Sequence, residues 1–134
     1  MKLELSPLAN AIARLDEGWA AYDRDRSQTL IRDGLIQRFE FTYEISHKIL
    51  KRYLEKSSPN PEEYDSISFQ DLIRTANERG LLLGDWSRWK LYREMRSRTS
   101  HTYHEDIALE VVKGIPAFLA EARYLCDQMM LRQD

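Results

Sequence analysis

The sequence predicts an all-α protein, an up-and-down bundle of about five helices, and three observations support this class. Apolar residues recur at steps of three and four through most of the chain, which is the spacing of one helical face. No segment alternates between apolar and polar residues as a half-buried strand does. Residues that start and stop helices divide the 134-residue chain into segments long enough to span a bundle. We therefore expect one four-helix-bundle-like domain over residues 1–134.

Two helices are predicted in the N-terminal part of the chain. The first begins after Ser6, which we interpret as its N-cap, with Pro7 in the first helical position. A charged run at residues 23–26 ends this helix, and Ser27 caps the next one. The second helix is expected over residues 29–55, about 40 Å long at ~1.5 Å per residue. The apolar stripes are Leu8, Ile12, Leu15, Trp19 and Tyr22, then Leu35, Phe39, Tyr43, Ile49, Leu50 and Tyr53.

A polar segment precedes two shorter helices. Residues 57–67 contain two prolines, an asparagine and three acidic residues, so we expect an exposed loop. Ser68 and Asp71 have the spacing of a capping box and open a third helix, which Gly80 stops. The dipeptide at residues 84–85 opens a fourth. The inward-facing residues of these two helices are Leu72, Ile73 and Ala76, then Trp86, Trp89, Tyr92 and Met95.

The last predicted helix is long and contains a proline. Thr102 and Glu105 have capping-box spacing and open it. Its apolar stripe continues in phase past Pro116, so we expect this residue to bend the helix near Gly114 without ending it. The stripe consists of Ile107, Val111, Ile115, Phe118, Ala122, Leu125 and Met129.

Composition excludes several classes of protein. The chain has 20 Lys and Arg against 22 Asp and Glu, and this balance argues against a general nucleic-acid coat protein. Its one cysteine, Cys126, cannot form an intrachain disulfide, so we expect a reduced, cytoplasmic setting. No window approaches the ~18 apolar residues of a membrane span, and the polar N-terminus is unlike a signal peptide. We therefore expect no membrane association.

Common catalytic templates are absent from the sequence. It has no Gly-rich phosphate loop, no CxxC pair and no HExxH pattern. Cys126 lies beside the apolar stripe of the last helix, where a cysteine is usually inert. His101, His104 and Glu105 are more typical of a solvated helix start than of a metal site. We expect neither a metal nor a cofactor.

The segment 92–106 holds the parts needed to act on a phosphodiester. Arg96 falls at the end of the fourth helix and His101 immediately before Thr102, so the turn between them can bring both side chains together. The amide groups of a helix start bind anions, the Arg fork matches two phosphate oxygens, and imidazole transfers protons near neutrality. The alternative interpretation is an arginine that interacts with the helix dipole and an ordinary turn histidine.

The surrounding stretch 86–100 carries five basic residues and one acidic residue. Such a run is most often a solvated helix face, but it can also hold a nucleic-acid backbone beside aromatic stacking faces. The further basic residues are Arg88, Lys90, Arg93 and Arg98, and the aromatic residues are Trp86, Trp89 and Tyr92. Tryptophans three residues apart more often belong to a core, so both interpretations stay open.

The amino-acid sequence around this junction resembles that of a known family. Arg96, His101 and Tyr103 form an R-x4-H-x-Y motif, which matches the signature of HEPN-domain proteins. The segments YREMRSRTSHTY, GDWSRWK and IQRFEFTYEISHKILKRYL are similar to the nucleotidyltransferase substrate-binding type of that family. The similarity extends over roughly residues 5–130. These relatives are the HEPN toxins encoded beside a minimal nucleotidyltransferase antitoxin.

The resemblance implies a dimeric helical bundle that acts as a metal-independent endoribonuclease, with paired R-x4-H motifs in a cleft at the dimer interface. Carried onto this sequence, Arg96 binds the scissile phosphate and His101 is the acid/base group. Tyr103 matches the tyrosine that the partner nucleotidyltransferase adenylylates. The residues expected to bind RNA phosphates are Arg93, Arg98 and Ser97.

Three functions remain open. The first is an RNA-cleaving toxin whose homodimer, with the fourth helix in its interface, supplies both the base and the acid. The second is a non-catalytic subunit that presents a nucleotide or other substrate to a separately encoded nucleotidyltransferase. Ser97 favours this second function, because the family usually has Asn, Asp or His after the arginine. The third is a scaffold dimer without a ligand.

Overall fold

A computed structural model describes residues 2–133, and in that range the chain is helical with no β-strand. The all-α prediction is confirmed. The five α-helices of that range are α1 (Ser6–Arg24), α2 (Thr29–Lys56), α3 (Phe69–Glu78), α4 (Trp86–Arg98) and α5 (Glu105–Arg132). Two short 3-10 helices, η1 (Pro61–Tyr64) and η2 (Thr99–His101), lie in the connections. None of the helices in this range is long and apolar enough to cross a membrane.

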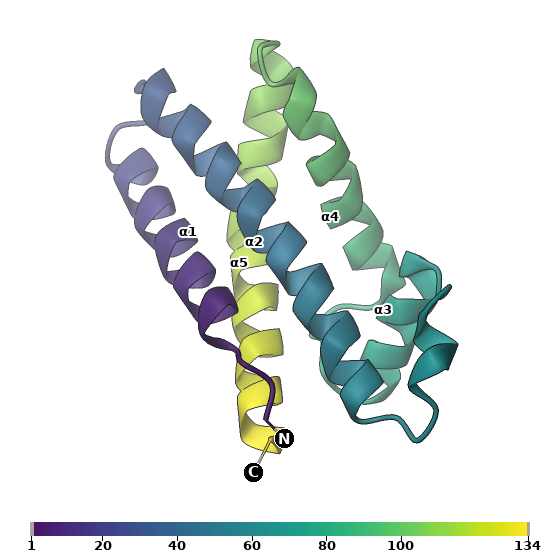
Figure 1. Ribbon diagram of the computed structural model, residues 1–134. Coiled ribbons are helices and arrows are strands. Elements are labelled where there is room, and N and C mark those ends of the chain that lie inside the picture. The colour runs from purple at the N-terminus through teal and green to yellow at the C-terminus, as the bar shows by residue number, and fades with distance from the viewer. Residues whose placement is uncertain (1, 134) are drawn as a thin grey trace.

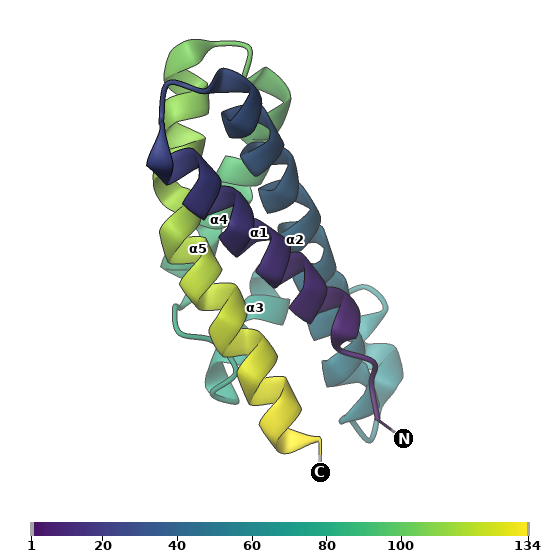
Figure 2. The ribbon, with the colours of Figure 1, turned by 90° about the vertical axis from the view of Figure 1, so that its left-hand side faces the viewer.

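The helices run up and down along one another (Figure 1). The long helices α1, α2 and α5 pack together, while α4 packs on α5 and α3. Figure 2 shows the same bundle from the side, with the α1–α2 turn and the α4–α5 junction at one end. At the opposite end, the Gln133 side chain accepts a hydrogen bond from the Leu3 amide at 2.8 Å and donates one to its carbonyl at 3.1 Å. The α4–α5 junction therefore lies far from the chain ends.

The predicted apolar stripes form one core. Phe39, Trp89 and Phe118 lie at its centre, with the Phe118 ring 5.0 Å from Phe39 and 6.0 Å from Trp89, both edge to face. Every stripe residue is buried or packs against the core as a partly buried side chain. The partly buried ones are Trp19, Tyr53, Trp86, Met95 and Ile107. Helical periodicity thus identified the inner face of each helix.

The predicted helix starts of α3 and α4 are confirmed. The Ser68 side chain accepts a hydrogen bond from the Asp71 amide at 3.1 Å, and Asp85 accepts one from the Ser87 amide at 3.0 Å. Each cap gives an otherwise unpaired amide of the first turn a partner. Gly80, as predicted, follows the end of α3, where its φ of 74° takes the left-handed conformation that favours glycine.

Three predicted helix caps are wrong. Ser27 does not cap α2, because Gln28 holds the cap position there without a side-chain bond. Ser6 is the first residue of α1, not its cap, and Leu5 holds the cap position without a side-chain bond. Thr102 does not cap α5, because the chain leaving α4 continues as the 3-10 helix η2. The helix begins at Glu105, and His104 holds the cap position. The capping-box spacing was present, but the backbone at residue 102 is still in the preceding turn.

The helix α5 runs without interruption through Pro116, as predicted. Just before this proline, α4 and α5 approach closely at Gly114. A Cβ atom added there would lie 2.5 Å from the Met95 sulfur, closer than real atoms come. The glycine therefore allows α4 to pack closely against α5 at Met95. This close contact lies one residue before Arg96.

Candidate functional site

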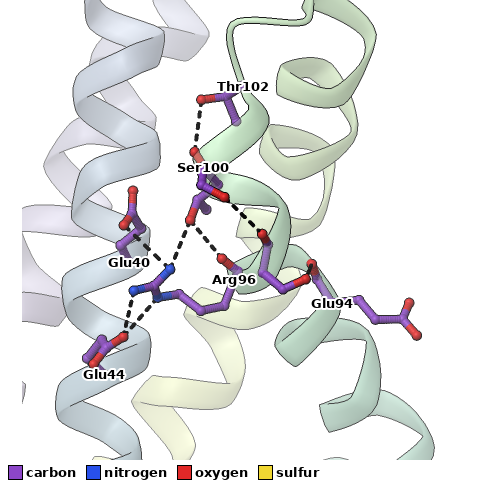
Figure 3. A network of polar contacts seen from close by, with 8 residues as sticks. Glu40, Glu44, Glu94, Arg96, Ser100 and Thr102 are labelled. Carbon is purple, nitrogen blue, oxygen red and sulfur yellow. Dashed lines mark hydrogen bonds and ion pairs between the residues drawn. The ribbon is translucent and has the colours of Figure 1, made fainter.

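The α4–α5 junction covers one end of the bundle and consists of η2 and the turn after it. It contacts α2 as well as α4 and α5. Its polar residues form a connected network, seen in Figure 3 between α2 on one side and the end of α4 on the other. Of the three motif residues, His101 and Tyr103 belong to this junction, and Arg96 lies in the last turn of α4 just before it.

Arg96 reaches across to α2 and binds two carboxylates there (Figure 3). Its Nε donates to Glu44 Oε1 at 3.0 Å, and its second terminal nitrogen lies 2.7 Å from the same oxygen. Its first terminal nitrogen lies 3.6 Å from Glu40 Oε2 and donates to Thr99 Oγ1 at 3.1 Å. The side chain is about one-third exposed. The guanidinium is therefore fixed in place by partners while part of it still faces solvent.

Thr99 connects Arg96 to the rest of the turn. This buried hydroxyl accepts from the Arg96 side chain and donates to the Arg96 carbonyl at 2.7 Å. The Thr102 hydroxyl donates to the Thr99 carbonyl at 3.2 Å, which stabilises the 3-10 turn that leads past His101. The Ser97 hydroxyl donates to the Glu94 carbonyl at 3.3 Å. The junction thus has a defined backbone, although most of its side chains are exposed.

The rings of His101, Tyr103 and His104 lie side by side on the surface. Their centroids are 6.1 Å apart for the first pair and 4.5 Å apart for the second. Tyr103 is 76% exposed, and both imidazoles are exposed. Tyr103 lies in the turn before α5 and is not its first residue, contrary to the prediction. All three rings are accessible to a ligand.

The start of α5 carries negative charge. Glu105 and Asp106 occupy its first turn, and the buried Arg32 of α2 donates to both carboxylate oxygens of Glu105. These bonds lower the pKa of Glu105 below its usual value. An incoming anion therefore meets carboxylates at this helix start, contrary to the expectation that its amides form an open anion site. The pair also joins α5 to α2 beside the motif.

The predicted phosphate-binding residues separate into two groups. Arg98 pairs with Glu110 of α5. Arg93 and Ser97 line a hollow on α4 together with Trp86, Lys90 and Glu94. The structure thus brings two of the three together and directs the third toward a different neighbour.

Two of the three predicted stacking residues belong to the core. Trp89 is 1% exposed and Tyr92 is 4% exposed, and both rings pack edge to face against Phe118. Neither can offer a face to a base, so this expectation was wrong for them. Trp86 remains partly exposed at the first turn of α4.

Sequence reasoning missed three carboxylates. Glu40 and Glu44 are four residues apart on α2, a spacing that places both on one helical face. That spacing was the signal available for them. Glu121 is 1% exposed and accepts hydrogen bonds from the amides of Leu83 at 2.7 Å and Gly84 at 2.8 Å. Its burial raises its pKa, and a single acid within the apolar stripe of α5 was its signal.

Within residues 2–133, no group of three or more His, Cys, Asp or Glu side chains is arranged to hold a metal ion. The junction instead presents the ion-paired guanidinium of Arg96, two exposed imidazoles and a phenol.

Comparisons with known proteins agree on one family. Residues 3–131 match the model of the family described as nucleotidyltransferase substrate binding protein like. A Haemophilus influenzae protein named probable ribonuclease HepT is 38% identical over 117 residues, which cover 87% of this chain and 80% of that one. A solved H. influenzae structure, described as the fold of a substrate-binding domain of a nucleotidyltransferase, has a TM-score of 0.88 and 35% identity, covering 95% of this chain and 99% of that one. A Thermus thermophilus crystal structure has a TM-score of 0.76 and 30% identity, covering 91% and 98%.

Proposed function

This chain belongs to the nucleotidyltransferase substrate-binding protein family, and from that premise we propose that it is a HEPN toxin that cleaves RNA without a metal ion. The observation that carries the proposal is the junction itself. Arg96 is oriented by carboxylates at the same end of the bundle where the His101 imidazole is exposed. The relative named a probable ribonuclease, 38% identical to this chain, supports the same activity.

The proposed reaction is a transesterification within the RNA strand. Arg96 binds the two non-bridging oxygens of the scissile phosphate with its planar fork. An imidazole of His101 takes the proton of the ribose 2′-OH, whose oxygen attacks phosphorus. The bond from phosphorus to the 5′-oxygen breaks, and that oxygen receives a proton. The products are a 2′,3′-cyclic phosphate and a 5′-hydroxyl. The nucleophile is part of the substrate, so no metal-activated water is required.

Two proton-transfer groups are needed, and the motif supplies one imidazole per chain. A two-fold homodimer brings two copies of Arg96 and His101 to one cleft, so that one imidazole acts as base and the other as acid. We propose that α4 contributes to this interface. Sedimentation at micromolar concentration tests it: a dimer is expected, and a stable monomer with full activity would contradict it.

Regulation is proposed to act through Tyr103. A minimal nucleotidyltransferase, encoded next to this chain and serving as its antitoxin in the cytoplasm, would transfer AMP from ATP to the exposed phenol. The phenol oxygen attacks the α-phosphorus, pyrophosphate leaves, and the new phosphodiester carries a negative charge. This group sterically blocks the cleft and competes with the RNA phosphate for Arg96. Mass spectrometry after incubation with that enzyme, ATP and Mg²⁺ should show the added mass in wild type and not in Tyr103→Phe.

A second function has its own support. A non-catalytic subunit that presents a substrate to a nucleotidyltransferase fits an Arg96 that already binds Glu40 and Glu44. The Ser97 hydroxyl donates its hydrogen bond to a backbone carbonyl, which also favours this second function. The description of the solved H. influenzae relative favours it as well. Under this function the purified chain binds a nucleotide and leaves RNA intact.

The deciding experiment incubates the purified protein with RNA in the presence of EDTA. We expect cleavage by wild type and a loss of about 10²–10⁴-fold in His101→Ala, the range typical of a general acid/base group. The matched control is His104→Ala, which removes another exposed imidazole from the same turn and should stay near wild-type activity. Equal rates in wild type and His101→Ala, or no cleavage by either, would overturn the proposed reaction.

A further inference from the structure

We propose that the hollow on α4, lined by Trp86, Lys90, Arg93, Glu94 and Ser97, binds a nucleotide of the RNA strand next to the one that is cleaved. The proposal rests on the proposed function and adds a binding site for the neighbouring base and phosphate. It assigns the base to the Trp86 indole and the phosphate to the two cations.

The hollow follows one face of α4 toward the motif. Trp86, Lys90, Arg93 and Ser97 are spaced by four, three and four residues, so they form a line along the helix. At ~1.5 Å per residue the line is about 16 Å long, and it ends beside Arg96. A strand that leaves the scissile phosphate along α4 therefore lies over these residues.

Arg93 connects the hollow to Arg96. The two arginines are one turn apart, and both lie near Tyr43 of α2. Burial raises the pKa of Tyr43 to about 12, and the positive charges of Arg93 and Arg96 oppose that rise. Two phosphates of one strand can thus contact adjacent turns of the same helix.

The cations of the hollow differ from Arg96 and Arg98 in forming no ion pair with an acidic side chain of the described residues. Arg96 and Arg98 form ion pairs, whereas Lys90 and Arg93 are exposed and form none within residues 2–133. Glu94 is the one acidic residue of the lining, and its side chain projects away from α2 (Figure 3). Two unpaired cations against one carboxylate favour a phosphate on the Arg93 side, and the Glu94 oxygens can accept from ribose hydroxyls.

Trp86 offers the aromatic surface. Its ring lies 5.9 Å from Phe69 at an interplanar angle of 68°, which holds the indole in one orientation. Unlike the buried Trp89 one turn later, it is partly exposed and lines the hollow. Stacking of a base on an aromatic side chain is independent of sequence, because every base has a π-face. The hollow therefore suits a nucleotide of any base.

The test measures binding of a labelled single-stranded RNA oligonucleotide to the full chain in the His101→Ala background, where cleavage is off. We expect Trp86→Leu to weaken binding about tenfold or more, and Trp86→Phe to restore most of it, since leucine keeps the packing and loses the π-face. Lys90→Ala and Arg93→Ala should each reduce the slope of log K against log salt by about 0.7. Arg14→Ala removes a cation of the α1–α2 side, which forms no ion pair with the residues that the structure describes, and should change neither quantity.

Two further arms separate this proposal from the proposed function. With His101 intact, Trp86→Leu should raise the KM for RNA and leave kcat unchanged. If Trp86→Leu and wild type cleave RNA and bind it with equal affinity, the proposed nucleotide site in the hollow is overturned, and the proposed nuclease activity stands. If RNA is not cleaved but ATP binds to wild type and not to Trp86→Leu, the hollow stands as a mononucleotide site and the nuclease fails. If neither RNA nor ATP distinguishes the two, the hollow is overturned.

Discussion

The two junctions on either side of α4 are built in opposite ways. The α3–α4 junction, residues 79–85, is held by side chains from elsewhere: Glu121 accepts from two of its amides, and Asn77 donates to the Gly84 carbonyl at 3.0 Å. Tyr124 and Arg132 donate to the Gly80 carbonyl, each at 3.3 Å. These polar backbone groups are paired by side chains of α3 and α5.

The α4–α5 junction instead holds its own backbone and leaves its rings exposed. Short hydroxyl-to-carbonyl bonds from Thr99 and Thr102 fix the turn, and the Arg32–Glu105 pair fixes the helix after it. His101 and Tyr103 are therefore available to a ligand. One helix thus begins at a loop that other elements hold and ends at a junction that leaves its rings exposed.

The largest effect is expected at the α4–α5 junction. Arg96→Lys keeps the charge and loses the two-point grip, so kcat/KM for RNA should fall by roughly 10²-fold or more, with little change in the thermal midpoint. Arg123→Lys, whose arginine pairs with Asp16 on the surface, is the control and should stay near wild type. If kcat/KM for RNA falls less than tenfold in Arg96→Lys, Arg96 does not bind the scissile phosphate through two hydrogen bonds.

The α3–α4 junction should respond in stability. Glu121→Ala leaves the amides of Leu83 and Gly84 without an acceptor, which should lower the free energy of unfolding by about 2–4 kcal/mol. Glu110→Ala removes an exposed carboxylate from the same helix and should cost less than about 1 kcal/mol. Urea unfolding of both variants measures the difference. Similar losses in the two would show that the buried carboxylate does not hold the loop.

A smaller effect is expected from the partners of Arg96. Glu44→Gln weakens the grip on the guanidinium, so RNA should bind roughly two- to fivefold more tightly while kcat falls, because the arginine is less well oriented. Steady-state kinetics separates KM from kcat. Glu17→Gln breaks an ion pair between α1 and α2 whose arginine is similarly exposed, and it serves as the control. An unchanged KM in Glu44→Gln would mean that the carboxylate does not compete with phosphate.

The smallest effect concerns acid and arises away from both junctions. His47 of α2 is half-buried against Phe69, with ring centroids 4.7 Å apart, and burial, aided by Lys51, lowers its pKa below 6.5. The unfolded chain then takes up the proton first, so stability is complete above about pH 6.5 and declines as the pH falls through the lowered pKa. His47→Phe should flatten this part of the profile between about pH 7.5 and 5.5, measured by urea unfolding.

The exposed His104 provides the control for that measurement. His104→Phe makes the same substitution at an exposed ring, and the comparison of the two variants isolates the contribution of His47. If both variants flatten the pH dependence of stability equally, the burial of His47 is not its cause.

The fold was predictable because each helix carries its own apolar stripe. The inward-facing residues from Leu8 to Met129 could be identified from the spacing within each helix, without knowing which helix packs against which. Helix starts were less predictable. Ser68 caps α3, but Thr102, with the same spacing to an acid, does not cap α5, because the turn before it closes as a 3-10 helix. Local spacing allows a cap, and the path of the chain decides whether it forms.

The candidate site was predictable only as far as its motif. Arg96, His101 and Tyr103 are close in sequence, so their positions at one junction followed from the helix boundaries. Glu44 lies 52 residues before Arg96 and meets it only after α2 and α4 pack together, so no local pattern could pair them. The same holds for Trp89, whose burial depends on the Phe118 ring of α5.

The carboxylates around Arg96 also determine which anions can reach it in a cell. Inorganic phosphate, chloride and small metabolites are abundant and compete for any exposed guanidinium. Because Glu44 and Glu40 already satisfy this arginine, a weak anion gains little by displacing them. A polyanion that binds several groups of the surface at once supplies the missing free energy. Under the proposed function, the paired arginine therefore favours a long strand over a small anion.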